Sequence, residues 1–141
     1  MVGMSSRSAP VLLAQSRACL EDAARAGRPA ERYAAAHLAA LRAATAVLAS
    51  RARPEVPGAR PRRPASAWAL LSGVAPELSE WAAFFAAAAA KRHAVEAGVT
   101  RIVGEREGDD LLRDAETFLA VCAATVGAGR SGAPTVLSAA G

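Results

Sequence analysis

Five arginines within a short proline-rich segment are the clearest candidates in this chain for binding phosphate. The segment from 51 to 66 reads RARPEVPGARPRRPAS, and its arginines are Arg51, Arg53, Arg60, Arg62 and Arg63. Four prolines and one glycine exclude regular helix, so we predict a mobile loop over about 54–64. Such arginines can hold a nucleic-acid backbone with a salt-sensitive affinity that does not depend on base sequence. The alternative is a solvated linker, because 16 arginines against one lysine indicate a high-GC coding bias.

The other polar residues predict no metal ion and no cofactor. The acids that could suggest a metal site are Asp109, Asp110, Asp114 and Glu116. No histidine accompanies them, and an acidic first turn of a helix explains them more simply than a metal site. Cys19 and Cys122 lie 103 positions apart, which is neither a ligand spacing nor a disulfide framework. We interpret both as free thiols in a reducing compartment.

Composition predicts a single helical domain. The chain has 141 residues, of which 39 are alanine and only six are aromatic, so its core has to be built from helices that pack closely. The net charge of +4 and the pI near 10.0 make an acidic partner plausible. The longest apolar run, 81–90, is about half of a membrane span, and no secretory segment is evident at the N-terminus. We therefore expect a cytoplasmic protein without a membrane partner.

Apolar residues recur at three- and four-residue steps in five segments, which predicts five helices. Their expected ranges are about 10–26, 29–53, 66–73, 76–97 and 105–126. Gly27 with Pro29, Pro54, Gly73 with Pro76, and Gly98 provide the boundaries. We expect a domain over 8–127 and a disordered tail over 128–141, where glycine, alanine and serine show no periodic stripe.

The stripes also predict which side chains form the core. Trp81 and Phe85 fall on one face of the fourth helix, and Phe118 and Cys122 fall on one face of the last. His37 lies on the apolar face of the second helix, where a half-buried, hydrogen-bonded histidine is the ordinary structural interpretation. A catalytic or phosphate-binding histidine is the alternative.

Four sequence blocks resemble one known family. They read ERYAAAHLAALRAATAVLA at 31–49, SAWALL at 66–71, APELSEWAAFF at 75–85 and DDLLRDAETFLA at 109–120. Over residues 10–126 the chain is similar to HEPN-like helical domains, specifically to a small high-GC bacterial branch. The resemblance implies an all-α, up-and-down bundle of four to five helices that commonly forms a homodimer.

The resemblance also implies candidate catalytic residues. Many HEPN proteins are metal-independent ribonucleases with an Arg-x(4–6)-His motif, in which histidine moves a proton and arginine stabilises phosphate charge. Arg32 and His37 match that spacing, although on one helix they lie about 140° apart. Two hypotheses follow. The first is a non-enzymatic module that binds RNA, nucleotide or a protein partner, and the second is a divergent ribonuclease, for example of a toxin–antitoxin pair.

Overall fold

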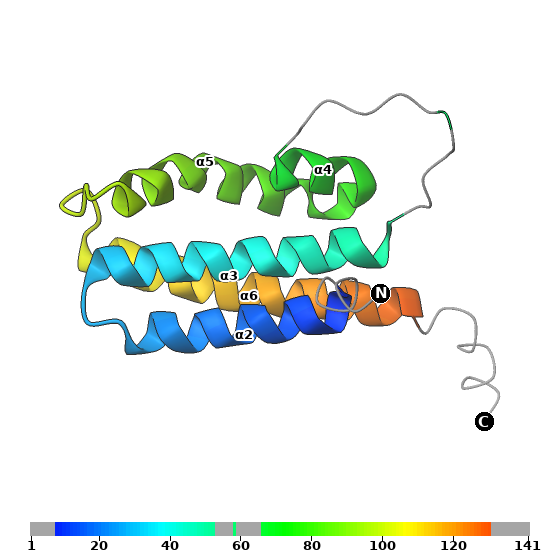
Figure 1. Ribbon diagram of the computed structural model, residues 1–141, viewed down its shortest axis with the longest axis horizontal. Helices are drawn as coiled ribbons and strands as arrows, with labels where there is room; N and C mark the ends of the chain where they lie inside the picture. Colours follow the sequence, from blue (N-terminus) through cyan, green and yellow to red (C-terminus); the bar gives the residue numbers. More distant parts are fainter. Residues whose placement is uncertain (1–7, 53–57, 59–65, 131–141) are drawn as a thin grey trace.

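The computed structural model describes residues 8–52, 58 and 66–130, and over these residues the chain is an all-α bundle without strands (Figure 1). The helices are α2 (Ala9–Arg25), α3 (Pro29–Ser50), α4 (Ala67–Val74), α5 (Ser79–Glu96) and α6 (Glu105–Arg130), with a 3-10 turn, η1 (Pro76–Leu78), before α5. The predicted fold class and the five predicted helices are confirmed. No helix of the described residues has the length and apolarity needed to cross a bilayer.

The long helices alternate in direction, and α3 is at the centre of the bundle. α3 contacts α2, α4, α5 and α6. α2 and α5 run opposite to α3 and α6, and they lie on either side of the α3–α6 pair (Figure 1). α5 packs on α3, whereas its backbone hardly approaches that of α6.

The ends of the helices follow from residues that were visible in the sequence. Pro29 occupies the first turn of α3, and the Ser66 hydroxyl accepts a hydrogen bond of 3.1 Å from the Ala69 amide at the start of α4. Gly98 adopts a φ of +102° just after α5, a conformation that favours glycine. Gly108 is needed for a different reason, because a Cβ there would lie 3.0 Å from the Pro29 carbonyl oxygen.

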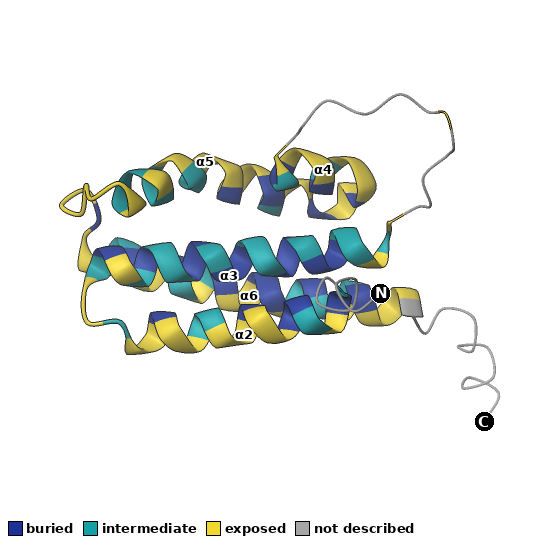
Figure 2. Cartoon of the chain, in the orientation of Figure 1, coloured by how far each residue is buried: buried dark blue, intermediate teal, exposed yellow. Residues whose placement is uncertain are grey.

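The core has two kinds of packing. Figure 2 shows that the buried residues concentrate on α3 and on the faces turned toward it. Alanines fill the contacts of α3 with its neighbours, and Ala36, Ala40, Ala43 and Ala44 are fully buried. Aromatic rings fill the space toward α4 and α5, with Phe85 and Phe118 fully buried. The alanine-rich composition is thus used where helices lie closest together.

Two details, the end of α6 and the burial of Trp81, differ from the sequence-based expectations. α6 continues through Arg130, so residues 128–130 are helical rather than part of a tail, and 131–141 lie outside the described residues. Most of the predicted loop at 54–64 also lies outside them. Trp81 is only half-buried, although its ring stacks on Phe85 and also contacts Phe118.

Candidate functional site

His37 lies inside the core of the bundle. Its side chain has no exposed surface, and its Nε2 is 2.8 Å from the Phe85 carbonyl oxygen on α5. A carbonyl oxygen only accepts hydrogen bonds, so Nε2 is the donor. Nδ1 is buried and has no hydrogen-bond partner among the described residues. Burial lowers the pKa of His37 more than the bond to Phe85 raises it, and the ring is therefore neutral near pH 7.

Aromatic rings from three other helices enclose His37. The imidazole meets the rings of Trp68 and Phe85 edge-on, at centroid distances of 5.7 Å and 6.0 Å. Trp68 stacks on Phe85 at 5.4 Å, and Phe118 lies 5.0 Å from Phe85. We call His37, Trp68, Trp81, Phe85 and Phe118 the ring cluster. In this arrangement the imidazole fills space and donates one hydrogen bond, and it is not open to a substrate.

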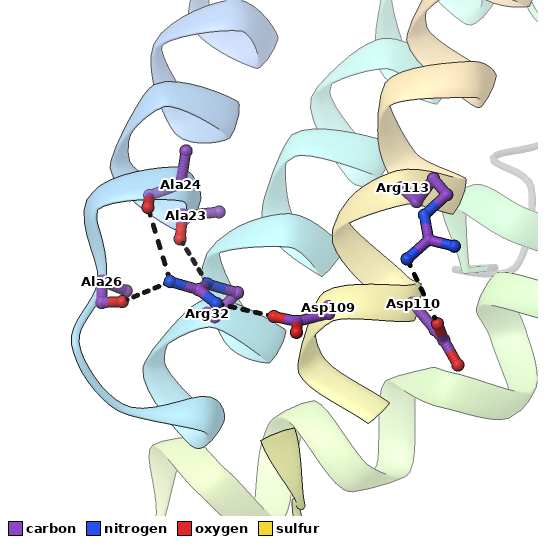
Figure 3. A network of polar contacts seen from close by, with 7 residues as sticks. All are labelled: Ala23, Ala24, Ala26, Arg32, Asp109, Asp110 and Arg113. Carbon is purple, nitrogen blue, oxygen red and sulfur yellow. Dashed lines mark hydrogen bonds and ion pairs between the residues drawn. The ribbon is translucent and has the colours of Figure 1, made fainter. Parts of the chain in front are cut away.

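Arg32 joins the ends of three helices. Its Nε donates to the Ala23 carbonyl at 3.0 Å, and its Nη2 donates to the Ala26 carbonyl at 2.7 Å and the Ala24 carbonyl at 3.4 Å (Figure 3). Its Nη1 bonds the Asp109 carboxylate at 2.6 Å. The guanidinium thus lies at the C-terminal end of α2, and the carboxylate lies in the first turns of α6, where each charge complements the helix dipole.

Arg32 and His37 therefore do not form one site within the chain. Arg32 faces α2 and α6, whereas His37 faces α4 and α5. The 140° separation expected from the helix period agrees with these two directions. The ordinary structural interpretation of His37 also fits, although the ring is more deeply buried than expected.

Of the five loop arginines, Arg51 lies within the described residues. Its Nη1 donates to the Val74 carbonyl at 2.9 Å, and its Nη2 pairs with Glu77 at 2.7 Å. The hydrogen bond from Arg51 is the main cause that lowers the pKa of Glu77. Arg51 therefore connects the end of α3 to η1. Arg53, Arg60, Arg62 and Arg63 lie outside the described residues, and their binding of phosphate stays a prediction.

Two of the four acids that were considered as metal ligands form ion pairs. Asp109 pairs with Arg32, and Asp110 is 3.6 Å from Arg113. Burial and the Asp110 charge raise the pKa of Asp114 above its ordinary value, while Arg113 acts in the opposite direction. Among the residues that the structure describes, no three potential ligands come together to hold a metal ion.

A groove of about 800 Å³ opens between α5 and the N-terminal half of α6. Its lining comprises Tyr33, Phe84, Ala87, Ala88, Lys91, Gly104, Arg106, Glu107, Asp110, Leu111 and Asp114. The α5 side is largely apolar, with Phe84 45% exposed, and the α6 side carries most of the charges. Near its end the Lys91 ammonium bridges to Glu107 at 2.6 Å.

Sequence reasoning missed this groove. The signal was the ten-residue run from 81 to 90, which carries no charge and makes α5 apolar on its outer face as well as on its core face. The hydrogen bond to Glu107 raises the pKa of Lys91, and burial raises the pKa of Tyr33. The groove thus combines apolar side chains, the Tyr33 phenol and the Lys91–Glu107 ion pair with the charges of Arg106, Asp110 and Asp114.

Comparison with protein families gives a match to the SAV_6107-like HEPN family over residues 23–123. The chain belongs to this family. The matched range contains all of α3, α4 and α5 and most of α6, and thus the ring cluster, Arg32 and the groove. The resemblance to HEPN domains seen in the sequence is confirmed. Searches of curated proteins and of solved structures gave no match.

Within this HEPN domain, the residues that match the Arg-x(4–6)-His spacing hold the bundle together, while the open surface lies elsewhere. His37 binds α5 to α3, and Arg32 binds α2 and α6 to α3. The groove presents Phe84 and the Lys91–Glu107 pair instead.

Proposed function

We propose that this HEPN domain is a non-catalytic interaction module whose partner is a protein. The observation that carries the proposal is the complete burial of His37. A general acid or base has to come within hydrogen-bond reach of the atom whose proton it moves. The His37 ring has one nitrogen bonded to Phe85 and the other enclosed within the core, which supports a structural role.

The composition of the groove favours a protein ligand. Its α5 side offers apolar side chains around Phe84, and the charge of Lys91 is already balanced by Glu107. Grooves with an apolar wall and a charged rim accept amphipathic helices. A phosphate backbone would instead need several unpaired cations, whereas the α6 wall places the acids Asp110 and Asp114 beside a single arginine, Arg106. We expect a homodimer, because HEPN domains commonly dimerise, and we expect it to be located in the cytoplasm.

RNA cleavage separates this proposal from the ribonuclease hypothesis. The full chain is incubated with labelled RNA in a chelator, beside His37→Gln and Arg32→Ala. We expect no cleavage above the buffer background for any of the three proteins. Cleavage by the wild type that falls about 10²-fold in His37→Gln, with both proteins equally stable, would establish the ribonuclease instead.

RNA binding without cleavage is tested with a second variant. Arg60, Arg62 and Arg63 are replaced together by alanine, and RNA affinity is measured against salt concentration. For a protein-binding module we expect weak RNA binding that this variant hardly changes. If the wild type binds tightly and the variant loses affinity with a shallower salt dependence, the ligand is a nucleic acid and the protein-partner proposal is wrong.

A further inference from the structure

α5 carries a second stripe of residues outside its core face, along the edge of the groove. Glu80, Phe84, Ala87 and Lys91 follow one another at steps of four, three and four, the spacing of a helix–helix seam. Glu80, Phe84 and Ala87 are exposed, and Lys91 is partly exposed. The outer face of a surface helix is ordinarily polar along its length. This one places charge only at its two ends and an exposed ring between them.

The stripe is complementary to itself. The positions 80 and 91, and likewise 84 and 87, are both centred on the point between residues 85 and 86. A second copy that runs antiparallel about a two-fold axis at this point would place Phe84 opposite Ala87 of the partner subunit. The same axis would place Glu80 opposite Lys91 of the partner subunit. One register thus matches a large side chain with a small one and an anion with a cation, twice each.

We propose that the protein forms a homodimer through α5, packed antiparallel against α5 of the partner subunit. The inference rests on the proposed function and names the partner for the α5 face. Small residues beside the ring, Ala83 and Ala87, permit the close approach that such a helix pair needs. Phe84, at the middle of the seam, is the expected anchor, because aromatic side chains that become fully desolvated dominate interfaces.

Glu80 and Lys91, at the two ends of the stripe, can each form an ion pair with the second copy. Among the described residues the Glu80 carboxylate makes no ion pair. Lys91 bonds Glu107, but an ammonium has three donors, so it can also bond a carboxylate from the second copy. Arg106, which lines the adjoining groove, adds a cation, whereas Asp110 and Asp114 on the same wall oppose an incoming acid. The apolar contacts therefore supply affinity, and the end charges select the antiparallel register.

The first test is the mass of the full chain in solution. Light scattering or sedimentation at micromolar concentration should give twice the 14.3 kDa of one chain. Phe84→Asp should raise the dimer Kd at least about 30-fold, as expected for an interface anchor. Leu70→Asp is the matched control, because Leu70 is 39% exposed on α4, away from the stripe, and the dimer should persist. A dimer that survives Phe84→Asp would overturn the proposed surface.

The second test is specific for the antiparallel register. Glu80→Lys and Lys91→Glu should each weaken the homodimer by bringing like charges together. An equimolar mixture should form the heterodimer, because each contact then joins opposite charges. A mixture that forms no heterodimer, while thermal melts show both variants folded, would overturn the register. A wild-type chain that stays monomeric would overturn the inference, but the proposed function would still be decided by the RNA assays.

Discussion

The two sides of α3 are packed in different ways. Toward α2 and α6, α3 contributes mainly buried alanines, and its neighbours contribute the buried side chains of Leu12, Leu13, Leu111 and Leu119. The Ser16 hydroxyl donates to the Ala39 carbonyl at 2.7 Å. Toward α4 and α5, the ring cluster fills a wider space with five large side chains. Small residues allow two helices to approach closely along their whole length. A few aromatic rings fill the space between more distant helices only at the positions of the rings.

This difference explains where the groove is. Rings occupy the gap beside α5 around Phe85, and toward Lys91 the α5 side chains become alanines. α5 packs on α3, and its backbone hardly approaches that of α6. The small alanine side chains therefore leave the groove between α5 and α6, which the Lys91–Glu107 ion pair crosses without filling it. An open surface therefore follows from the same shortage of large apolar residues that permits close packing on the other side.

Phe85→Ala should cause the largest loss in the free energy of unfolding, because the core between α3 and α5 is filled by aromatic rings. Phe85 is fully buried and contacts Trp68, Trp81 and Phe118, so its loss should cost about 3 to 5 kcal/mol. Trp81→Ala should cost less, because Trp81 is only half-buried. Denaturant unfolding followed by circular dichroism measures both. Equal losses would show that the two rings are equally desolvated.

Ala43→Leu should test how closely α3 packs against its neighbours through buried alanines. Ala43 is fully buried, so a larger side chain has to push helices apart, and we expect a loss of about 1 to 3 kcal/mol. Ala24→Leu on the exposed face of α2 is the matched control and should stay within about 0.5 kcal/mol of the wild type. If Ala43→Leu is as stable as its control, the alanine contacts are looser than the structure describes.

Arg32→Ala should have a smaller effect, because its side chain is 29% exposed and water can replace part of its bonding. We expect a loss of about 1 to 2 kcal/mol, since three carbonyls at the end of α2 lose a charged donor. Asp109→Asn should cost less than about 1 kcal/mol, as for a pair near the surface. Thermal melts of both variants measure the difference, and equal losses would assign the effect to the ion pair rather than to the carbonyls.

The sequence predicted the helices well because proline, glycine and serine mark their ends locally. Pro29, Ser66 and Gly98 act within a few residues of where they stand. The role of Arg32 was not predictable in that way, because its partners are Ala23, nine positions away, and Asp109, 77 positions away. The outer stripe of α5 was missed because alanines on both faces hide the difference between a core face and an open one.

The last and smallest expected effect is a dependence of stability on pH that comes from His37. Burial lowers the pKa of the folded state below the ordinary value of 6.5, so the unfolded chain binds a proton more readily than the folded chain. Arg92 and His93 on α5 lower it further, while the hydrogen bond to Phe85 and the charge of Glu96 act in the opposite direction. Stability should therefore be constant above about pH 7 and should fall as the pH drops below 6.5. The unfolding free energy should therefore be lower at pH 5.5 than at pH 7.

Two variants test whether His37 causes that pH dependence of stability. His37→Gln keeps an amide donor for the Phe85 carbonyl but has no proton to gain, so its unfolding free energy should change little over the same interval. His93→Gln is the matched control, because His93 is exposed and lowers the pKa of His37 less than burial does, so most of the decline should remain. Denaturant unfolding at several pH values between 7.5 and 5.5 measures all three proteins. If the decline persists in His37→Gln, another group causes it, and the buried imidazole is not the residue that links protonation to unfolding.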